Sequence, residues 1–82
     1  MTEMKEYTVR EKGLDLYTVV TDEPEKHLRN LMSSLVNDRS AHSIAVRRHL
    51  TDEQLEDLEL SIEREGELLF LMWSDGSRII RS

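Results

Sequence analysis

The sequence predicts an α+β fold: a ββαβαββ two-layer sandwich in which a four- or five-stranded mixed sheet carries two helices on one face. Three observations predict this class. Two alternating runs rich in β-branched and aromatic residues come first, two capped segments with helical apolar spacing follow, and an apolar run with an Asp-Gly pair comes last. The 82 residues suffice for one small core, so residues 1–82 are expected to form a single domain.

The first two strands are expected at residues 4–10 and 14–21, with Lys12 and Gly13 between them. This pattern is typical of a β-hairpin. Alternation places Tyr7 and Val9 on one face of the first strand. The same rule places three residues of the second strand on one face, expected to lie in the core: Leu14, Leu16 and Val20.

A helix is expected from Asp22 to about Asn37. Asp22 is a suitable cap, Pro24 is tolerated in a first turn, and Glu25 follows Asp22 by three residues as in a capping box. The apolar residues then recur at helical spacing and predict one buried stripe: Leu28, Leu31, Met32 and Leu35.

A third strand is expected at residues 43–50, where alternation places Ile44, Val46 and Leu50 on one face. Thr51 and Gln54 then have the spacing of a capping box, and a second helix is expected over residues 52–65. This helix would end at Gly66. Its predicted buried stripe is Leu55, Leu58 and Ile62, while Leu60 points away from the stripe and is expected to be exposed.

Two final strands are expected at residues 68–73 and 78–81, joined by a turn at Asp75 and Gly76. This turn would place Trp73 opposite Arg78, where the two side chains can make a cation–π contact. It would also pair Met72 with Ile79, Leu71 with Ile80 and Phe70 with Arg81. The run 68–73 is apolar on both faces, so we expect helices to cover one face and the other to be a candidate interface.

The net charge of −6 is unevenly distributed. Residues 51–67 contain eight acids and one base, a local charge of 1 − 8 = −7, so the other residues sum to +1. Such a balance favours solubility and disfavours nonspecific binding to nucleic acid or to anionic membranes. The longest unbroken apolar run has six residues, 68–73, so we expect no membrane span and a cytoplasmic protein.

The residues that carry chemistry are sparse. The chain has no cysteine, and its three histidines, His27, His42 and His49, lack the short spacing of metal ligands. Ser33 and Ser34 lie in a predicted helix without a nucleophile-elbow glycine pattern. We therefore expect no metal, no cofactor and no enzymatic activity.

Residues 43–58 read Ser-Ile-Ala-Val-Arg-Arg-His-Leu-Thr-Asp-Glu-Gln-Leu-Glu-Asp-Leu. This quarter of the chain resembles the first half of a ribbon-helix-helix DNA-binding subunit. The resemblance implies DNA binding through a basic strand. The family's second helix has no counterpart after Gly66, where an apolar hairpin is expected. The candidate nucleic-acid contacts are Arg39, Arg47, Arg48 and His49.

The favoured functional hypothesis is a noncatalytic protein-interaction domain whose acidic helix binds a basic partner surface. One concrete form is a small phage- or plasmid-type inhibitor that occupies a basic surface of a host defence or nucleic-acid-handling complex. A DNA-binding regulator subunit and a structural homodimer are the alternatives. The predicted partner-binding residues are Asp52, Glu53, Glu56, Asp57, Glu59, Leu60, Glu63, Trp73 and Arg78.

Overall fold

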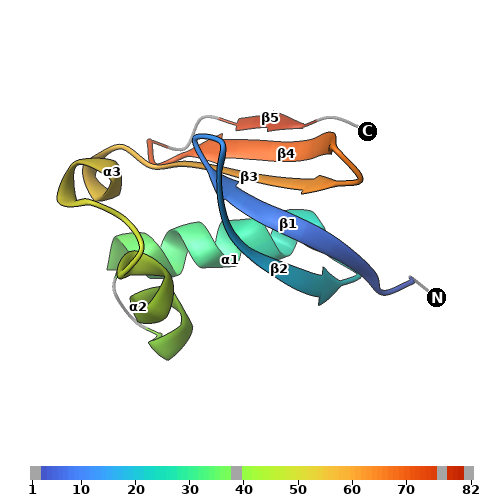
Figure 1. The fold of residues 1–82 in the computed structure, drawn as a ribbon, viewed down its shortest axis with the longest axis horizontal. Helices are drawn as coiled ribbons and strands as arrows, with labels where there is room; N and C mark the ends of the chain where they lie inside the picture. Colours follow the sequence, from blue (N-terminus) through green and yellow to red (C-terminus); the bar gives the residue numbers. More distant parts are fainter. Residues whose placement is uncertain (1–2, 38–39, 76–77, 81–82) are drawn as a thin grey trace.

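The computed structural model describes residues 3–37, 40–75 and 78–80, and they form an α+β fold, as the sequence predicts. The order of elements along the chain is ββαααβββ (Figure 1). The elements are β1 (Lys5–Glu11), β2 (Leu14–Thr21), α1 (Pro24–Asn37), α2 (Ala41–Arg47), α3 (Asp52–Glu56), β3 (Glu59–Arg64), β4 (Glu67–Trp73) and β5 (Arg78–Ile80).

The five strands form one sheet in the order β2-β1-β3-β4-β5. Every neighbouring pair is antiparallel, so the expectation of a mixed sheet is wrong. β3 lies at the centre, where Ile62 pairs with Val9 of β1 on one side and with Phe70 of β4 on the other. β3 therefore joins the amino-terminal strands β1 and β2 to the carboxy-terminal strands β4 and β5 in one sheet.

The predicted amino-terminal hairpin is confirmed. Lys12 and Gly13 have φ values of 49° and 85°, the two positive values that a type I′ turn requires. Tyr7 and Val9 are buried, as expected. The predicted core face of β2 is wrong in part, because Leu16 is partly buried against the core but Leu14 and Val20 are 50% and 57% exposed. Tyr17 and Val19, which pair with the buried Val9 and Tyr7, also pack against the core.

The predicted helix at residues 22–37 is confirmed as α1, which begins at Pro24 and buries the whole predicted stripe. Figure 1 shows α1 across one face of the sheet, where it contacts β3 and β4. The buried apolar side chains of the described residues form one cluster between α1 and the sheet: Tyr7, Val9, Leu28, Leu31, Met32, Leu35, Val46, Leu50, Leu58, Leu60, Ile62 and Phe70.

The strand expected at residues 43–50 is wrong, because this segment contains α2. A capping box formed by Ser40 and Ser43 begins the helix. The buried residues are Ser43, Val46 and Leu50, a helical spacing, whereas Ile44 is exposed. The apparent alternation of Ile44 and Val46 thus spans both faces of a helix.

The helix expected at residues 52–65 is wrong beyond Glu56. The predicted capping box of Thr51 and Gln54 is present, but Asp57 adopts φ −138° and ends α3 after five residues. β3 follows, and its neighbours bury Leu58, Leu60 and Ile62 completely. Leu60, expected to be exposed, is therefore a core residue. Gly66, expected to end a helix, lies with Glu65 in the turn that joins β3 to β4.

The carboxy-terminal strands pair one residue away from the predicted register. Met72 lies opposite Arg78 and Leu71 opposite Ile79, so the expected pairing of Trp73 with Arg78 is wrong. Gly76 of the predicted turn and Arg81 lie outside the described residues. Phe70 is buried, and the rest of the apolar run in β4 is half-buried, so neither face of this strand is fully open: Leu68, Leu69, Leu71, Met72 and Trp73.

Candidate functional site

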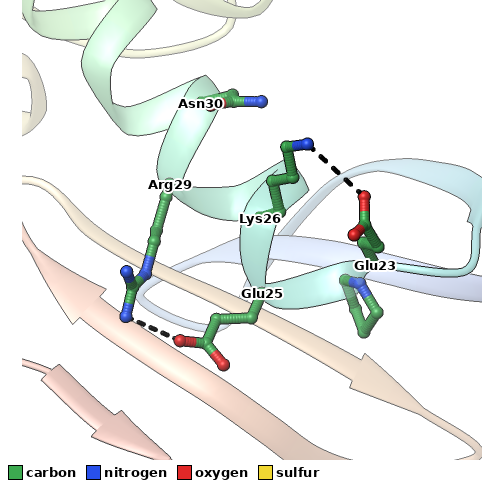
Figure 2. Close-up of a pocket in the computed structure, with 6 residues that line it drawn as sticks. Glu23, Glu25, Lys26, Arg29 and Asn30 are labelled. Atoms are coloured by element: carbon green, nitrogen blue, oxygen red, sulfur yellow. Dashed lines mark hydrogen bonds and ion pairs between the residues drawn. The ribbon is translucent and has the colours of Figure 1, made fainter.

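A hollow of about 470 Å³ runs along the first turns of α1 (Figure 2). Its charged side chains neutralise one another in pairs. Lys26 Nζ lies 3.6 Å from a carboxylate oxygen of Glu23, and Arg29 lies 2.6 Å from Glu25. The lining residues all come from this one short stretch of chain, residues 23–30. This hollow is a poor candidate for a binding site.

The acids at α3 form a more distinctive surface at the end of the molecule where β3 begins (Figure 1). None of the five residues of α3 is buried. Four acids from the helix and its C-cap are exposed, and we call them the α3 acidic surface: Asp52, Glu53, Glu56 and Asp57.

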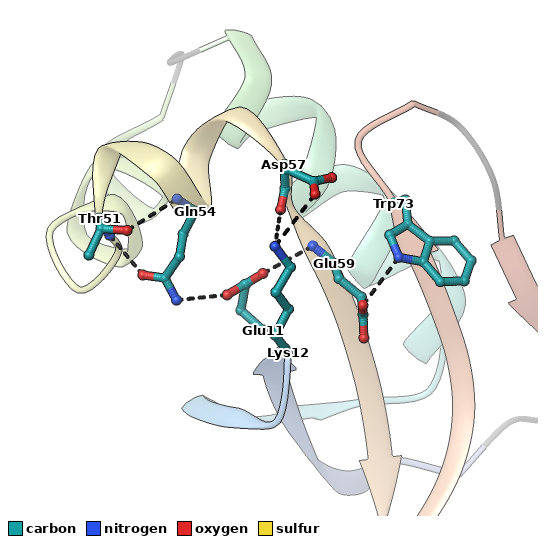
Figure 3. A network of polar contacts seen from close by, with 7 residues as sticks. All are labelled: Glu11, Lys12, Thr51, Gln54, Asp57, Glu59 and Trp73. Carbon is teal, nitrogen blue, oxygen red and sulfur yellow. Dashed lines mark hydrogen bonds and ion pairs between the residues drawn. The ribbon is translucent and has the colours of Figure 1, made fainter.

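A buried carboxylate attaches this exposed helix to the sheet (Figure 3). Glu11, at the end of β1, is fully buried. One of its oxygens accepts a hydrogen bond from Gln54 Nε2 at 2.9 Å, and the other accepts from the backbone amide of Glu59 at 3.1 Å. The side chain of Gln54 also accepts from the amide of Thr51 at 2.8 Å, so the capping box and the buried carboxylate share one side chain.

The turn between β1 and β2 holds the other end of α3. Lys12 Nζ donates to the backbone oxygen of Asp57 at 2.7 Å and lies 3.7 Å from its carboxylate (Figure 3). The amide of Lys12 donates to the oxygen of Glu59 at 3.1 Å. α3 is therefore held through Gln54 by the buried carboxylate and at its C-cap by Lys12, while Leu55 packs, partly buried, against the core.

The remaining predicted partner contacts do not join the α3 acidic surface, because they belong to the sheet. Glu59 accepts a hydrogen bond from Trp73 Nε1 at 3.2 Å. Glu63 lies 3.3 Å from Arg10 and is mostly covered. Leu60 is buried, and Arg78 lies on β5 at the far edge of the sheet.

The predicted nucleic-acid residues do not lie on a strand. Arg47 is in the last turn of α2 and donates to the backbone oxygen of Leu35 at 2.5 Å. Arg48 is the C-cap of α2, and His49 follows it; both are exposed. Arg39 lies outside the described residues. The basic strand on which the ribbon-helix-helix resemblance depends is therefore absent from the described chain, and the capped helix that follows it, α3, has only five residues.

The structure brings together histidines that the sequence places on separate elements. The hydroxyl of Tyr17 on β2 and Nε2 of His27 on α1 are hydrogen-bonded at 2.6 Å. The ring of His42 on α2 lies edge-on to Tyr17, with centroids 4.9 Å apart, and 6.4 Å from the ring of His27. Three elements thus meet at one polar aromatic cluster.

Burial determines the charge state of this cluster. It raises the pKa of the Tyr17 hydroxyl, which therefore stays protonated at neutral pH. Burial, followed by repulsion from a charged His42, lowers the pKa of His27. A protonated phenol bonded to an uncharged imidazole joins β2 to α1 without a net charge.

Two small hollows flank His42. One, of about 170 Å³, lies between β2 and α2 and includes Tyr17 and His49 in its lining. The other, of about 100 Å³, lies between α1 and α2 and includes His27. Within residues 3–37, 40–75 and 78–80, no three histidine or carboxylate side chains are placed to hold a metal ion together. The cluster is best described as a contact among three elements.

Sequence reasoning missed Glu11, although a signal was present. Residues 7, 9 and 11 alternate, so the face that carries Tyr7 and Val9 also carries this acid. A carboxylate on a core face needs hydrogen-bond donors, which here come from α3 and β3. No comparable pattern in the sequence predicts that His27 and His42 lie close together.

No protein-family model matches the chain, and neither the curated proteins nor the solved structures contain a match to it. In the part of the chain that the structure describes, no helix has the length and apolar character needed to cross a bilayer.

Proposed function

We propose that this protein is a noncatalytic interaction domain that presents the α3 acidic surface to a basic surface on a partner protein. One observation carries the proposal: no residue of α3 is fully buried, and a hydrogen bond from Gln54 to the fully buried Glu11 helps to hold the helix in place. A five-residue helix is too short to be stable alone. The contacts that hold α3 keep four exposed acids in a defined arrangement.

Preorganisation is what makes such a surface suited to binding. Ordering a flexible segment on association costs free energy, and a segment that is already ordered avoids that cost. Exposed charges around it accelerate encounter with a partner of opposite charge and disfavour partners of the same charge. The acids also lie at one end of the molecule, while the residues outside 51–67 sum to only +1.

The concrete form of the proposal is a small phage- or plasmid-type inhibitor. Its target would be a protein whose basic surface ordinarily binds nucleic acid, because such surfaces are selected to receive negative charge. The acids of α3 would occupy that surface in place of phosphates.

The test is capture from a native lysate by three forms of the immobilised chain. The variant combines Asp52→Asn, Glu53→Gln and Glu56→Gln. A matched control, Glu3→Gln, Glu65→Gln and Glu67→Gln, removes the same charge from exposed positions outside α3. Captured proteins are quantified by mass spectrometry, with and without added duplex DNA or RNA.

We expect at least one protein to be retained by the wild-type chain and the control and lost from the α3 variant. Added nucleic acid should displace that protein, since both ligands would use one basic surface. The proposal is wrong if every captured protein binds the α3 variant as well as the control. Capture that depends on α3 but resists nucleic acid would contradict only the inhibitor form.

A further inference from the structure

The two edges of the sheet differ in how they are protected. Among the described residues, β5 forms one edge with three residues, whereas β2 forms the other with eight. Residues 17–21 of β2, which lie beyond the register shift opposite Val9 and Arg10, contain no charged residue and no proline. Short length, charge and proline are the features that commonly prevent a sheet edge from pairing with another strand. β2 is therefore the edge that is open to a further strand.

Apolar side chains are exposed beside the same edge. Five large hydrophobic residues are exposed in the described chain, and three of them belong to the β1–β2 hairpin or directly precede it. They are Met4, Leu14 and Val20, which are 60%, 50% and 57% exposed. Met4 and Val20 lie at one end of the hairpin and Leu14 at the other, so a partner along β2 would cover apolar side chains at both ends of the strand.

We propose that β2 pairs antiparallel with β2 of a second copy of this chain, about a two-fold axis that passes beside Thr18. An axis perpendicular to the sheet keeps each face on its own side, so the two five-stranded sheets become one. In this register Thr18 lies opposite its own counterpart and Tyr17 opposite Val19, both in the regular part of β2.

The strand that pairs with this edge is expected to be β2 of a second copy, because β2 is complementary to itself. Every one of these cross-strand pairs joins β-branched, aromatic or aliphatic residues, which stabilise antiparallel pairing, and no like charges are opposed. In a two-fold interface the same surface patch of both copies is in contact, so that patch has to be complementary to itself.

The charges beyond the strand ends also match. Beyond the paired residues, Lys12 in the turn of one copy, which also contacts Asp57, lies towards the first turn of α1 in the other. That turn begins at Pro24, with Glu23 and Glu25 on either side of it. The side chains of Lys12 and Glu23 are 41% and 59% exposed. Opposite charges at both ends of the paired strands favour this register.

Sedimentation velocity of the full chain tests the proposal. At about 100 µM, a concentration that reveals micromolar affinities, we expect twice the molar mass of the monomer. Thr18→Lys and Thr18→Glu should each give a monomer, because each places like charges opposite one another at the axis. An equimolar mixture of the two variants should recover the dimer, because the charges are then opposite.

Val36→Lys is the matched control. Val36 lies on α1 and is 58% exposed, almost the same as Val20 on β2. We expect Val36→Lys to remain dimeric and Val20→Lys to be monomeric. Circular dichroism of each variant establishes that it is folded.

Hydrogen exchange of the wild-type chain supplies a readout that needs no variant. Amides of β2 should exchange more slowly as the concentration rises, while those of β5 should not change. A wild-type monomer at 100 µM, a Thr18→Lys dimer, or a mixture that stays monomeric overturns the proposal. These outcomes are independent of α3, so they leave the proposed function unaffected.

Discussion

His27 is the residue whose protonation is coupled most directly to the fold. Its ring is hydrogen-bonded to Tyr17 and lies near His42, so it joins α1 to β2 and faces α2. Burial and the repulsion from His42 lower its pKa below the ordinary value of 6.5. The folded protein therefore favours the uncharged form of His27 more strongly than the unfolded chain does.

The free energy of unfolding should consequently depend on pH. Between the pKa of folded His27 and 6.5, the unfolded chain binds more protons, so stability rises with pH. The contribution of His27 is complete above 6.5 and is lost as the pH falls through the folded pKa. Urea unfolding across this range should show the trend, and His27→Gln should flatten it.

Titration of the imidazole signals by NMR gives the direct measurement. His27 should titrate below its ordinary value, and His42→Gln should raise its pKa because it removes the repelling charge. His49→Gln, which changes an exposed histidine beyond α2, is the control and should have less effect. A folded His27 that titrates at or above 6.5 would contradict this account.

At the scale of elements, two segments carry the same kind of start signal but continue differently. Ser40 with Ser43 and Thr51 with Gln54 both form complete capping boxes. α2 then buries Ser43 and Val46, whereas α3 has only the partly buried Leu55 against the core and ends at Glu56. A capping box therefore specifies where a helix begins, and packing determines how far it extends.

Thr51→Ala should loosen α3 selectively. It removes the oxygen that accepts the amide of Gln54 at 3.1 Å, at a cost of about 0.5–2 kcal/mol. Because α3 has no buried residues, we expect the loss to appear as faster amide hydrogen exchange in α3, with exchange in α1 unchanged. Ser40→Ala, the same kind of change in α2, should accelerate exchange in α2 instead. Equal exchange in α3 before and after Thr51→Ala would show that the cap is unimportant there.

The sequence predicts helices and strands well where the spacing of the apolar residues fits only one kind of secondary structure. The stripe of α1 fits only a helix, and all four of its residues are buried. Residues 55–62 fit two periods: Leu55, Leu58 and Ile62 suggest a helix, while Leu58, Leu60 and Ile62 suggest a strand. The structure selects the strand, since β1 and β4 supply backbone partners on both sides of β3.

The candidate site was predictable only where it depends on a local pattern in the sequence. The exposed acids of α3 follow from its local capping signal and were predicted. Glu59 and Glu63 were predicted to join these acids on one helix. They lie in β3 instead, where Glu59 is hydrogen-bonded to Trp73 and Glu63 forms an ion pair with Arg10. The buried Glu11 and the clustered histidines depend on contacts between distant segments, which local patterns do not specify.

At the scale of the whole molecule, β3 is the element that unites the fold. It is the central strand, it pairs with both β1 and β4, and its inner face contacts α1. Leu60 lies on that face and is fully buried. A substitution there tests the entire arrangement, because a helix over residues 52–65 would leave Leu60 exposed.

Leu60→Ala should lower the free energy of unfolding by about 2–5 kcal/mol, the cost of a cavity left by a buried leucine. Leu14→Ala is the matched control at a leucine that is 50% exposed, and it should cost clearly less. Urea denaturation of both variants measures the difference. Equal losses would contradict the placement of β3 at the centre of the sheet.

The sequence alone determines the features that depend on near neighbours along the chain. These are the Lys12-Gly13 turn, the buried stripe of α1, the capping box of α3 and the concentration of acids in residues 51–67. Only the tertiary structure decides that residues 59–64 form a strand, that Glu11 holds α3, and that His27 meets His42. The physical reason is that a short apolar pattern satisfies more than one backbone geometry. The choice between them rests on hydrogen-bond partners and burial supplied by segments far away in the chain.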